Sequence, residues 1–289
     1  MDFLIYLVFR AFIFLFRFIP FRLLFGFADL VYYLVYYIAG YRKKVVFMNL
    51  RKSFPGKTEQ EIRAIAKGFY HHFADMVVES LKAFTMAEEE VVSRYKFHNT
   101  AFMDDMFKKG KPVIVVAGHY GNWEWAGIAA GTQMLHKPVG FYKPLSNKFI
   151  DRYIQRTRVR GRSRLASILK TAETFKTDWG EPAAFYMVAD QSPSSARLAY
   201  WVNFMNQETA VLHGPEKYAR ISDFPVVFAC AKRVKRGYYE VDFKIIEAEP
   251  VKTKTGEITG RFMQMLEEVI NENPRYYLWS HRRWKLKRK

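Results

Sequence analysis

Apolar residues dominate the first forty positions of the chain, and charge interrupts them at only a few points. The interruptions in residues 3–40 are Arg10, Arg17, Arg22 and Asp29. No uncharged run reaches the roughly 18 residues of a simple membrane-spanning helix, while Arg10 and Arg17, seven apart, share one helical face. The pattern predicts a helical membrane anchor over residues 1–40, which either spans the bilayer with snorkelling arginines or lies in its interface. The alternative is a buried helix of a globular domain.

The following stretch carries apolar residues at helical spacing. Residues 41–54 predict a short basic amphipathic helix, which Pro55 and Gly56 end. Thr58 and Glu61 form a capping box for a long helix that reaches Phe84. A second capping box, Thr85 with Glu88, predicts a short helix after it.

From residue 95 onward, short apolar runs alternate with helical patterns. The expected strands are residues 95–98, 112–117, 139–142, 165–169, 183–189, 198–204, 226–231 and 239–246. The expected helices are residues 100–109, 123–135, 147–159, 171–178, 214–221 and 259–273. This alternation predicts a single α/β domain over residues 41–289, with a mixed, mostly parallel sheet flanked by helices.

Charge and cysteine content indicate which partners and which cellular compartment to expect. The net charge of +18 favours a polyanionic partner, which is a nucleic acid, an acidic protein or an anionic membrane surface. Arg42, Lys43 and Lys44 follow the apolar segment, so the positive-inside rule places the rest of the chain on the cytoplasmic side. Cys230 is the only cysteine, which excludes an internal disulfide and favours a reducing compartment. The chain has no Cys/His spacing typical of a metal site, and we expect no bound metal.

The candidate chemistry lies in residues 111–127, KPVIVVAGHYGNWEWAG, which predict a buried strand, a tight turn and a helix start. Asn122 is the expected N-cap of that helix. His119 and Glu124 are five residues apart, so they would diverge on one helix but can converge across a strand–turn–helix break. An imidazole held by a carboxylate is a general base. The alternative is a loop histidine beside a glutamate that only complements the helix dipole.

The last residues, 276–289, read YYLWSHRRWKLKRK and interleave aromatic with basic side chains. This composition suits phosphate groups at an apolar–polar boundary, and equally a nucleic acid bound by stacking and charge. The third interpretation is a frayed, solvated chain end.

Several of these segments together resemble a known family. They are Asn49-Leu50 with Phe54-Pro55-Gly56, AGHYGNWEWAG, ADQSP at residues 189–193 and NPRYYLWSHRRWK at residues 273–285. In this order they resemble the bacterial lipid A biosynthesis late acyltransferases, the lauroyl and myristoyl transferases, over nearly the whole chain. The H-x4-E spacing alone is a weak signal, whereas its combination with ADQ and LWSHRRWK is specific.

The resemblance implies an inner-membrane protein that works at the cytoplasmic face. It would move a fatty acyl chain from an acyl carrier protein thioester to a hydroxyl of a lipid A precursor, an anionic glycolipid, without any cofactor. His119 would be the general base and Glu124 its orienting partner. Arg158 matches best an arginine that the family uses, although Arg160, Arg162 and Arg164 crowd the same stretch. Asp190, Gln191 and Asn122 complete the expected substrate site.

Two other interpretations stay open. The first keeps the chemistry and changes the acceptor to an aminolipid, another glycolipid or an aryl lipid, because DQSPSS departs from the DQD pattern of the family. A glycerol phosphate acceptor is only a minor alternative, since the E-G-x-R block of glycerolipid acyltransferases is missing from the sequence. The second is a basic protein without catalysis that binds nucleic acid or coats membranes. It explains the charge and the tail but leaves the His119–Glu124 turn unexplained, so we expect no nucleic-acid partner.

Overall fold

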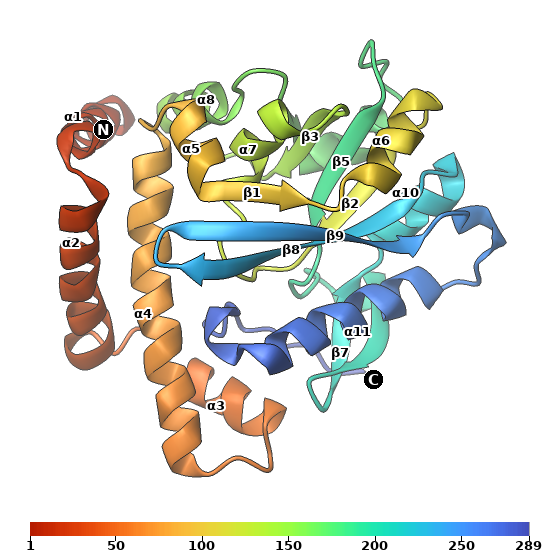
Figure 1. The fold of residues 1–289 in the computed structure, drawn as a ribbon. Coiled ribbons are helices and arrows are strands. Elements are labelled where there is room, and N and C mark those ends of the chain that lie inside the picture. Colours follow the sequence, from red (N-terminus) through yellow and green to blue (C-terminus); the bar gives the residue numbers. More distant parts are fainter. Residues whose placement is uncertain (289) are drawn as a thin grey trace.

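A twisted sheet with helices on both faces forms the centre of the molecule, and two N-terminal helices lie along one side of it (Figure 1). The computed structural model describes residues 1–288. The seven strands follow the order β1-β9-β8-β2-β5-β3-β4, and every neighbouring pair is parallel except β8 with β9. The sheet strands are β1 (Tyr95–His98), β2 (Val113–Ala117), β3 (Lys137–Tyr142), β4 (Arg164–Ser167), β5 (Ala183–Val188), β8 (Val226–Lys235) and β9 (Tyr238–Glu247). The predicted α/β fold with a mostly parallel mixed sheet is confirmed.

Helices cover the sheet and extend beyond it. They are α1 (Asp2–Phe18), α2 (Phe21–Tyr33) with a π-helical turn (Leu34–Ile38), α3 (Lys43–Ser53), α4 (Glu59–Ala83), α5 (Glu88–Arg94), α6 (Ala101–Lys108), α7 (Ala126–Gln133), α8 (Lys148–Arg158), α9 (Thr171–Thr174), α10 (Gly214–Ser222) and α11 (Glu257–Glu272). The Thr58–Glu61 capping box is confirmed at the start of α4. The Thr85–Glu88 capping box is wrong, because Ala87 is the N-cap of α5 and the Thr85 hydroxyl donates to the Lys82 carbonyl.

The central strand β2 is buried on both of its faces. Ile114 and Val116 belong to one hydrophobic cluster of the core, which includes α11, while Val113 and Val115 belong to the cluster under α7. A strand that helices cover on both faces has a continuous run of β-branched residues in its sequence rather than alternating apolar and polar residues. This run therefore explains why β2 lies in the middle of the sheet. The turn that contains His119 follows the carboxyl end of β2.

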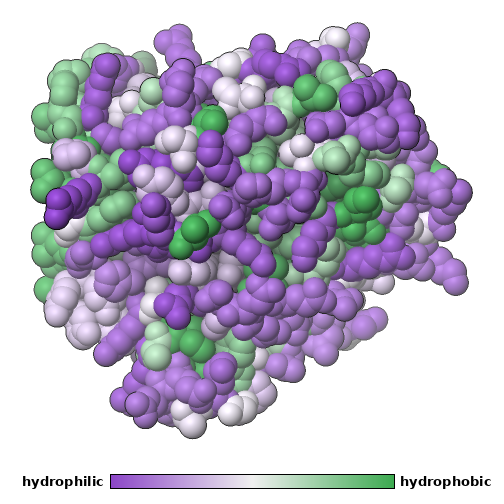
Figure 2. Space-filling model, in the orientation of Figure 1, coloured by the Kyte–Doolittle hydropathy of each residue, from purple (hydrophilic) through white to green (hydrophobic). Residues whose placement is uncertain are grey.

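The apolar N-terminus packs against α4 and also faces outward. The side chains of Phe16, Leu24 and Tyr32 are buried in the main core cluster. Figure 2 shows apolar atoms along the edge of the molecule that α1 and α2 form. Among the described residues, Phe21–Ile38 is the one helical stretch whose length and composition would suffice to cross a membrane, which is weak support for an anchor.

The chain end clamps the turn that carries His119. The Gly121 amide donates to the Tyr276 carbonyl at 3.0 Å, and the Leu278 amide donates to the His119 carbonyl at 3.1 Å. Trp279 is fully buried in the core. The interpretation of the tail as a frayed end is therefore wrong for residues 276–279.

Gly121 gives a test of how tightly the turn packs against β8. Its φ is +61°, and a Cβ there would lie 2.0 Å from the Ala231 carbonyl oxygen. Gly121→Ala therefore combines left-handed backbone strain with a backbone clash, and we expect it to lower the free energy of unfolding by at least about 2 kcal/mol. The control is Gly260→Ala in α11, where a Cβ meets nothing within 4 Å and should stabilise the helix by about 0.5–1 kcal/mol. Urea unfolding of both variants in detergent measures the difference, and equal stabilities would contradict this close packing of the turn against β8.

Candidate active site

Strand register brings the two central side chains of the site together. In the parallel pair β2–β5, Ala117 lies opposite Val188. His119 and Asp190 each come two residues later, so both emerge at the same edge of the sheet. The His119 Nδ1 lies 2.5 Å from the Asp190 Oδ1, and the two side chains are 15% and 3% exposed.

Gln191 contacts the other imidazole nitrogen. Its Nε2 lies 3.0 Å from the His119 Nε2. Because Nδ1 donates to a carboxylate, Nε2 is the nitrogen without a proton, and it accepts from the Gln191 amide. The hydrogen bonds thus assign the tautomer that a general base needs, with its lone pair on Nε2.

Burial and charge act in opposite directions on this pair. Burial alone would lower the pKa of His119, but the charge of Asp190 and the hydrogen bond with it raise that pKa above its ordinary value. Burial would likewise raise the pKa of Asp190, and the charge of His119 together with their hydrogen bond lowers it instead. Asp190 therefore stays ionised and stabilises the imidazolium that forms when His119 accepts a proton.

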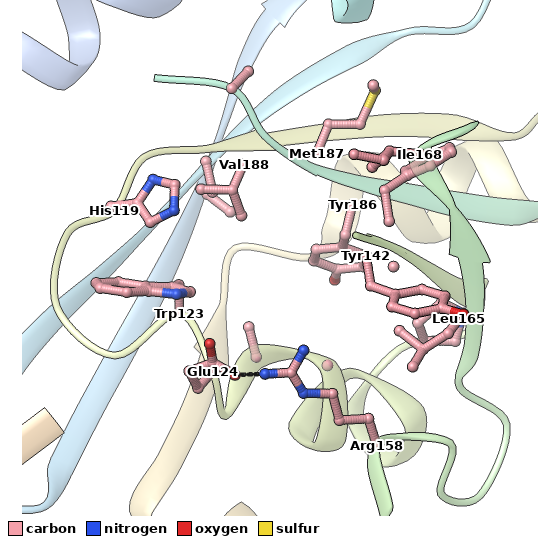
Figure 3. A pocket seen from close by; sticks show the side chains of 18 of the residues that line it. His119, Trp123, Glu124, Tyr142, Arg158, Leu165, Ile168, Tyr186, Met187 and Val188 are labelled. Atoms are coloured by element: carbon pink, nitrogen blue, oxygen red, sulfur yellow. Dashed lines mark hydrogen bonds and ion pairs between the residues drawn. The ribbon is translucent and has the colours of Figure 1, made fainter. Parts of the chain in front are cut away.

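Glu124 contacts Arg158 and not His119. An ion pair joins the Glu124 carboxylate to the Arg158 guanidinium, and Figure 3 shows the indole of Trp123 between the imidazole and this pair. The Trp123 ring centroid is 4.9 Å from that of His119 in an edge-on arrangement. The orienting contact expected for Glu124 is thus made by Asp190, because Glu124 lies after the turn and faces the end of α8. Arg158, which the family resemblance indicated, lines the same cavity as His119.

Asn122 shapes the turn from the inside. Its Oδ1 accepts from the amides of Glu124 and Trp125, both at 3.1 Å, and its Nδ2 donates to the Glu79 carboxylate at 2.7 Å. Asn122 is therefore not the N-cap that the sequence predicted, because α7 begins at Ala126 and its N-cap is Trp125, which has no side-chain cap. The side chain is fully buried, so it holds the turn and does not make the expected substrate contact. The amides of Glu124 and Trp125 already donate to Asn122, so they are not free to bind an oxyanion.

Glu79, which the sequence analysis missed, supports this turn from α4. Its carboxylate also accepts from the Tyr239 hydroxyl at 2.8 Å, and burial raises its pKa to about 7. The available signal was its position three residues after Met76, which puts a carboxylate on the buried face of an amphipathic helix. Buried carboxylates require partners, and Asn122 is one of them.

The tail adds further groups that the sequence did not assign individually. Arg283 is buried, donates to the Ala210 carbonyl at 2.6 Å, and contributes to the lowered pKa of Asp190. His281 accepts from the Ser192 amide at 3.3 Å, and burial lowers its pKa to about 4. The LWSHRRWK segment therefore packs beside the Asp190 loop.

Two cavities meet at this site. The larger, about 930 Å³, includes His119 and Arg158 and is lined at the strand ends largely by apolar groups (Figure 3). These include Tyr142, Leu165, Ile168, Tyr186, Met187 and Val188. The smaller, about 510 Å³, runs along α4 and the tail, and it shares Trp123, Glu124 and Gln191 with the first. Both volumes lie in the usual range of ligand sites, roughly 300–1,000 Å³.

Cys230 is not placed for nucleophilic catalysis. It is buried in β8, and burial raises the pKa of its thiol to about 12. The reactive thiolate is therefore disfavoured. The site offers a carboxylate-held base at the mouth of an apolar cavity, an arrangement that can activate a hydroxyl in the presence of an acyl chain.

Comparison with known proteins agrees with this geometry. The sequence profile of the family described as "Bacterial lipid A biosynthesis acyltransferase" matches residues 2–286. The chain is also 23% identical over 252 residues to the lipid A biosynthesis lauroyltransferase of Escherichia coli K12, covering 84% of this chain and 79% of that protein. The family profile extends over almost the whole chain, including the N-terminal segment and the tail. The chain therefore belongs to the bacterial lipid A biosynthesis acyltransferase family.

Proposed function

We propose that this acyltransferase moves a fatty acyl chain from an acyl carrier protein thioester to a hydroxyl of a lipid A precursor. The reaction would take place at the cytoplasmic face of the inner membrane. Family membership supports acyl transfer in lipid A biosynthesis. The observation that carries the proposed mechanism is the hydrogen-bonded pair of Asp190 and His119 at the mouth of the larger cavity.

The reaction then needs one base and no covalent enzyme intermediate. The acceptor hydroxyl replaces the Gln191 amide at the His119 Nε2 and gives its proton to that nitrogen. Its oxygen attacks the thioester carbonyl, the new C–O bond forms, and the C–S bond breaks as the tetrahedral intermediate collapses. The imidazolium returns the proton to the leaving thiolate, while Asp190 stabilises the charged ring.

Arg158 is the cation that we propose for the developing negative charge. It lines the larger cavity together with His119, and its ion pair with Glu124 holds the guanidinium in place. A fixed positive group near an oxyanion stabilises the transition state more than the ground state. Glu124 acts in this scheme as a positioning residue for Arg158.

Two cavities suit a reaction with two substrates. Because both reach Trp123 and Gln191, we infer that the acyl chain and the acceptor approach His119 from different sides. The net charge of +18 suits both an acidic carrier protein and a phosphorylated glycolipid. An aminolipid, another glycolipid or an aryl lipid as acceptor would keep the same chemistry.

The base is tested first. We expect His119→Ala to lower the rate of acyl transfer by about 100- to 10,000-fold, because the acceptor hydroxyl loses its proton acceptor. His98→Ala is a matched control, since His98 is exposed on β1 and outside both cavities. The assay follows labelled acyl groups from acyl carrier protein to a detergent-dispersed lipid A precursor. Transfer at the wild-type rate by His119→Ala would overturn the mechanism.

The carboxylate that holds the base is tested by pH dependence. The raised pKa of His119 means that activity falls as the pH drops through it, because the imidazole becomes charged. Asp190→Asn removes the charge that raises this pKa, so the acid limb of kcat/KM should move to lower pH, and the plateau should drop roughly 100- to 10,000-fold. An acid limb that stays in place would show that Asp190 does not hold the base.

Glu124→Gln tests whether Glu124 positions Arg158, as their ion pair indicates, or His119, as the sequence spacing suggested. If Glu124 positions Arg158, the variant should lose roughly ten- to a hundredfold in kcat/KM, with a smaller shift of the acid limb than Asp190→Asn shows. The same pH series measures both. An acid limb that moves further in Glu124→Gln than in Asp190→Asn would make Glu124 the partner of His119 after all.

A further inference from the structure

The N-terminal helices present an apolar surface that the domain does not cover. Leu4, Leu15, Leu23 and Leu30 on α1 and α2 are all more than half exposed, and Ile38 at the end of the π-helical turn is 78% exposed. Figure 2 shows apolar atoms gathered along this edge, and Figure 1 places both helices on the same side of the molecule. A contiguous apolar surface on two neighbouring helices is typical of a membrane contact.

A charged group in the middle of α2 argues against a helix that crosses the bilayer. Asp29 lies at the centre of Phe21–Ile38, and its carboxylate is 2.6 Å from the guanidinium of Arg236 on the β8–β9 turn. Arg236 also binds the buried Asp75 of α4 at 2.6 Å. A spanning α2 would bring this network and the folded domain to the bilayer centre, where charged groups are strongly disfavoured.

The end of α1 is equally fixed to the domain. The Lys82 ammonium donates to the carbonyls of Phe16, Arg17 and Ile19 at 3.0, 2.9 and 2.8 Å. The helix has 17 residues, about 25 Å at 1.5 Å per residue, which is shorter than the roughly 30 Å hydrocarbon core. Both helices are therefore held along the side of the domain.

A basic groove adjoins the lower end of this apolar surface. It has a volume of about 620 Å³ and lies between the π-helical turn, α3 and α4. Its basic side chains are Lys43, Lys44, Arg51, Arg63 and Lys67, and its aromatic side chains include Tyr36 and Tyr37. In the described part of the chain Arg51 pairs with Glu59, whereas the other four cations form no ion pair.

Helix spacing explains why these cations converge. Lys43 and Arg51 lie on one face of α3, with Phe47 between them, and Arg63 and Lys67 are four apart on α4. The Lys43 ammonium lies 3.9 Å from the centre of the Tyr36 ring, and both side chains line the groove. Tyr37, half exposed, belongs to both the groove and the apolar surface. Cations and tyrosines at the edge of an apolar surface match the headgroup layer of an anionic membrane.

We propose that α1 and α2 lie in the plane of the membrane surface and that this groove binds the phosphate of an anionic phospholipid headgroup. The protein is then monotopic, which means that it contacts one leaflet only and that its α/β domain lies outside the bilayer on that side. This inference rests on the membrane setting of the proposed function. It adds an orientation and a lipid site that the acyl-transfer chemistry does not require.

The lipid site is tested by binding to vesicles of phosphatidylcholine with and without one-third phosphatidylglycerol. The double variant Arg63→Ala/Lys67→Ala should weaken binding to the anionic vesicles roughly tenfold or more, since two groove cations are lost. The control Lys108→Ala/Lys254→Ala removes the same charge from exposed positions at the end of α6 and shortly before α11. Figure 1 shows α6 and the start of α11 on the side of the domain away from α1 and α2, so this control should lose less than about threefold. Equal binding by wild type and groove variant, or an equal loss in the control, would overturn the site. Binding of inorganic phosphate without tighter binding to anionic vesicles would also overturn it.

The orientation is tested by the depth of spin labels in the bilayer. Single cysteines at Leu4, Leu15, Leu23 and Leu30, in a Cys230→Ser background, should report one shallow depth if both helices lie in the plane. A label at Leu30 that is much deeper than one at Leu23 would show a spanning helix and overturn the proposal. Acyl transfer by the groove variant to a detergent-dispersed acceptor should stay at the wild-type rate. Loss of binding with intact transfer thus concerns the lipid site, and loss of transfer by His119→Ala concerns the chemistry.

Discussion

The hydrogen bond between His119 and Asp190 is the interaction on which the site depends. It joins two neighbouring parallel strands at the edge where both end, at a place that is largely closed to water. In such surroundings a carboxylate and an imidazole each make the charged form of the other less costly. The pair fixes the imidazole tautomer and directs the second nitrogen toward the cavity. The surrounding architecture holds the turn that brings His119 to this position.

Buried polar groups supply much of that support. Asn122 occupies the inside of the turn, Glu79 and Tyr239 hold Asn122 in place, and the chain end pairs with the turn backbone. Buried polar side chains are costly when they lose a partner, so they favour one arrangement of the turn over others. The same logic applies to the neighbouring cluster of Asp75, Arg233 and Arg236, which joins α4 to the β8–β9 hairpin. These clusters explain how a glycine-containing segment can hold the proposed base, His119, in one position.

The sequence predicted the elements better than their contacts. The continuous β-branched run of β2 and the capping box of α4 rest on local chemistry, and both were confirmed. Spacing between His119 and Glu124 suggested their contact, but the order of strands in the sheet decided it, and strand order is not readable from one sequence. Strand β7 (Gln207–Leu212) was missed because it pairs only with β6 (Ala199–Phe204) in a separate hairpin. Its turn uses Met205 and Asn206 at positive φ rather than the glycine that marks most such turns.

The central claim is that this chain acylates lipid A. Mass spectrometry of lipid A and total lipids, from cells with and without the chain, tests it most directly. The account predicts that lipid A from cells without the chain lacks one acyl group, and that the missing mass equals the chain transferred. Unchanged lipid A in those cells would contradict the proposed acceptor, and a different lipid lacking its acyl group would identify the acceptor that replaces it.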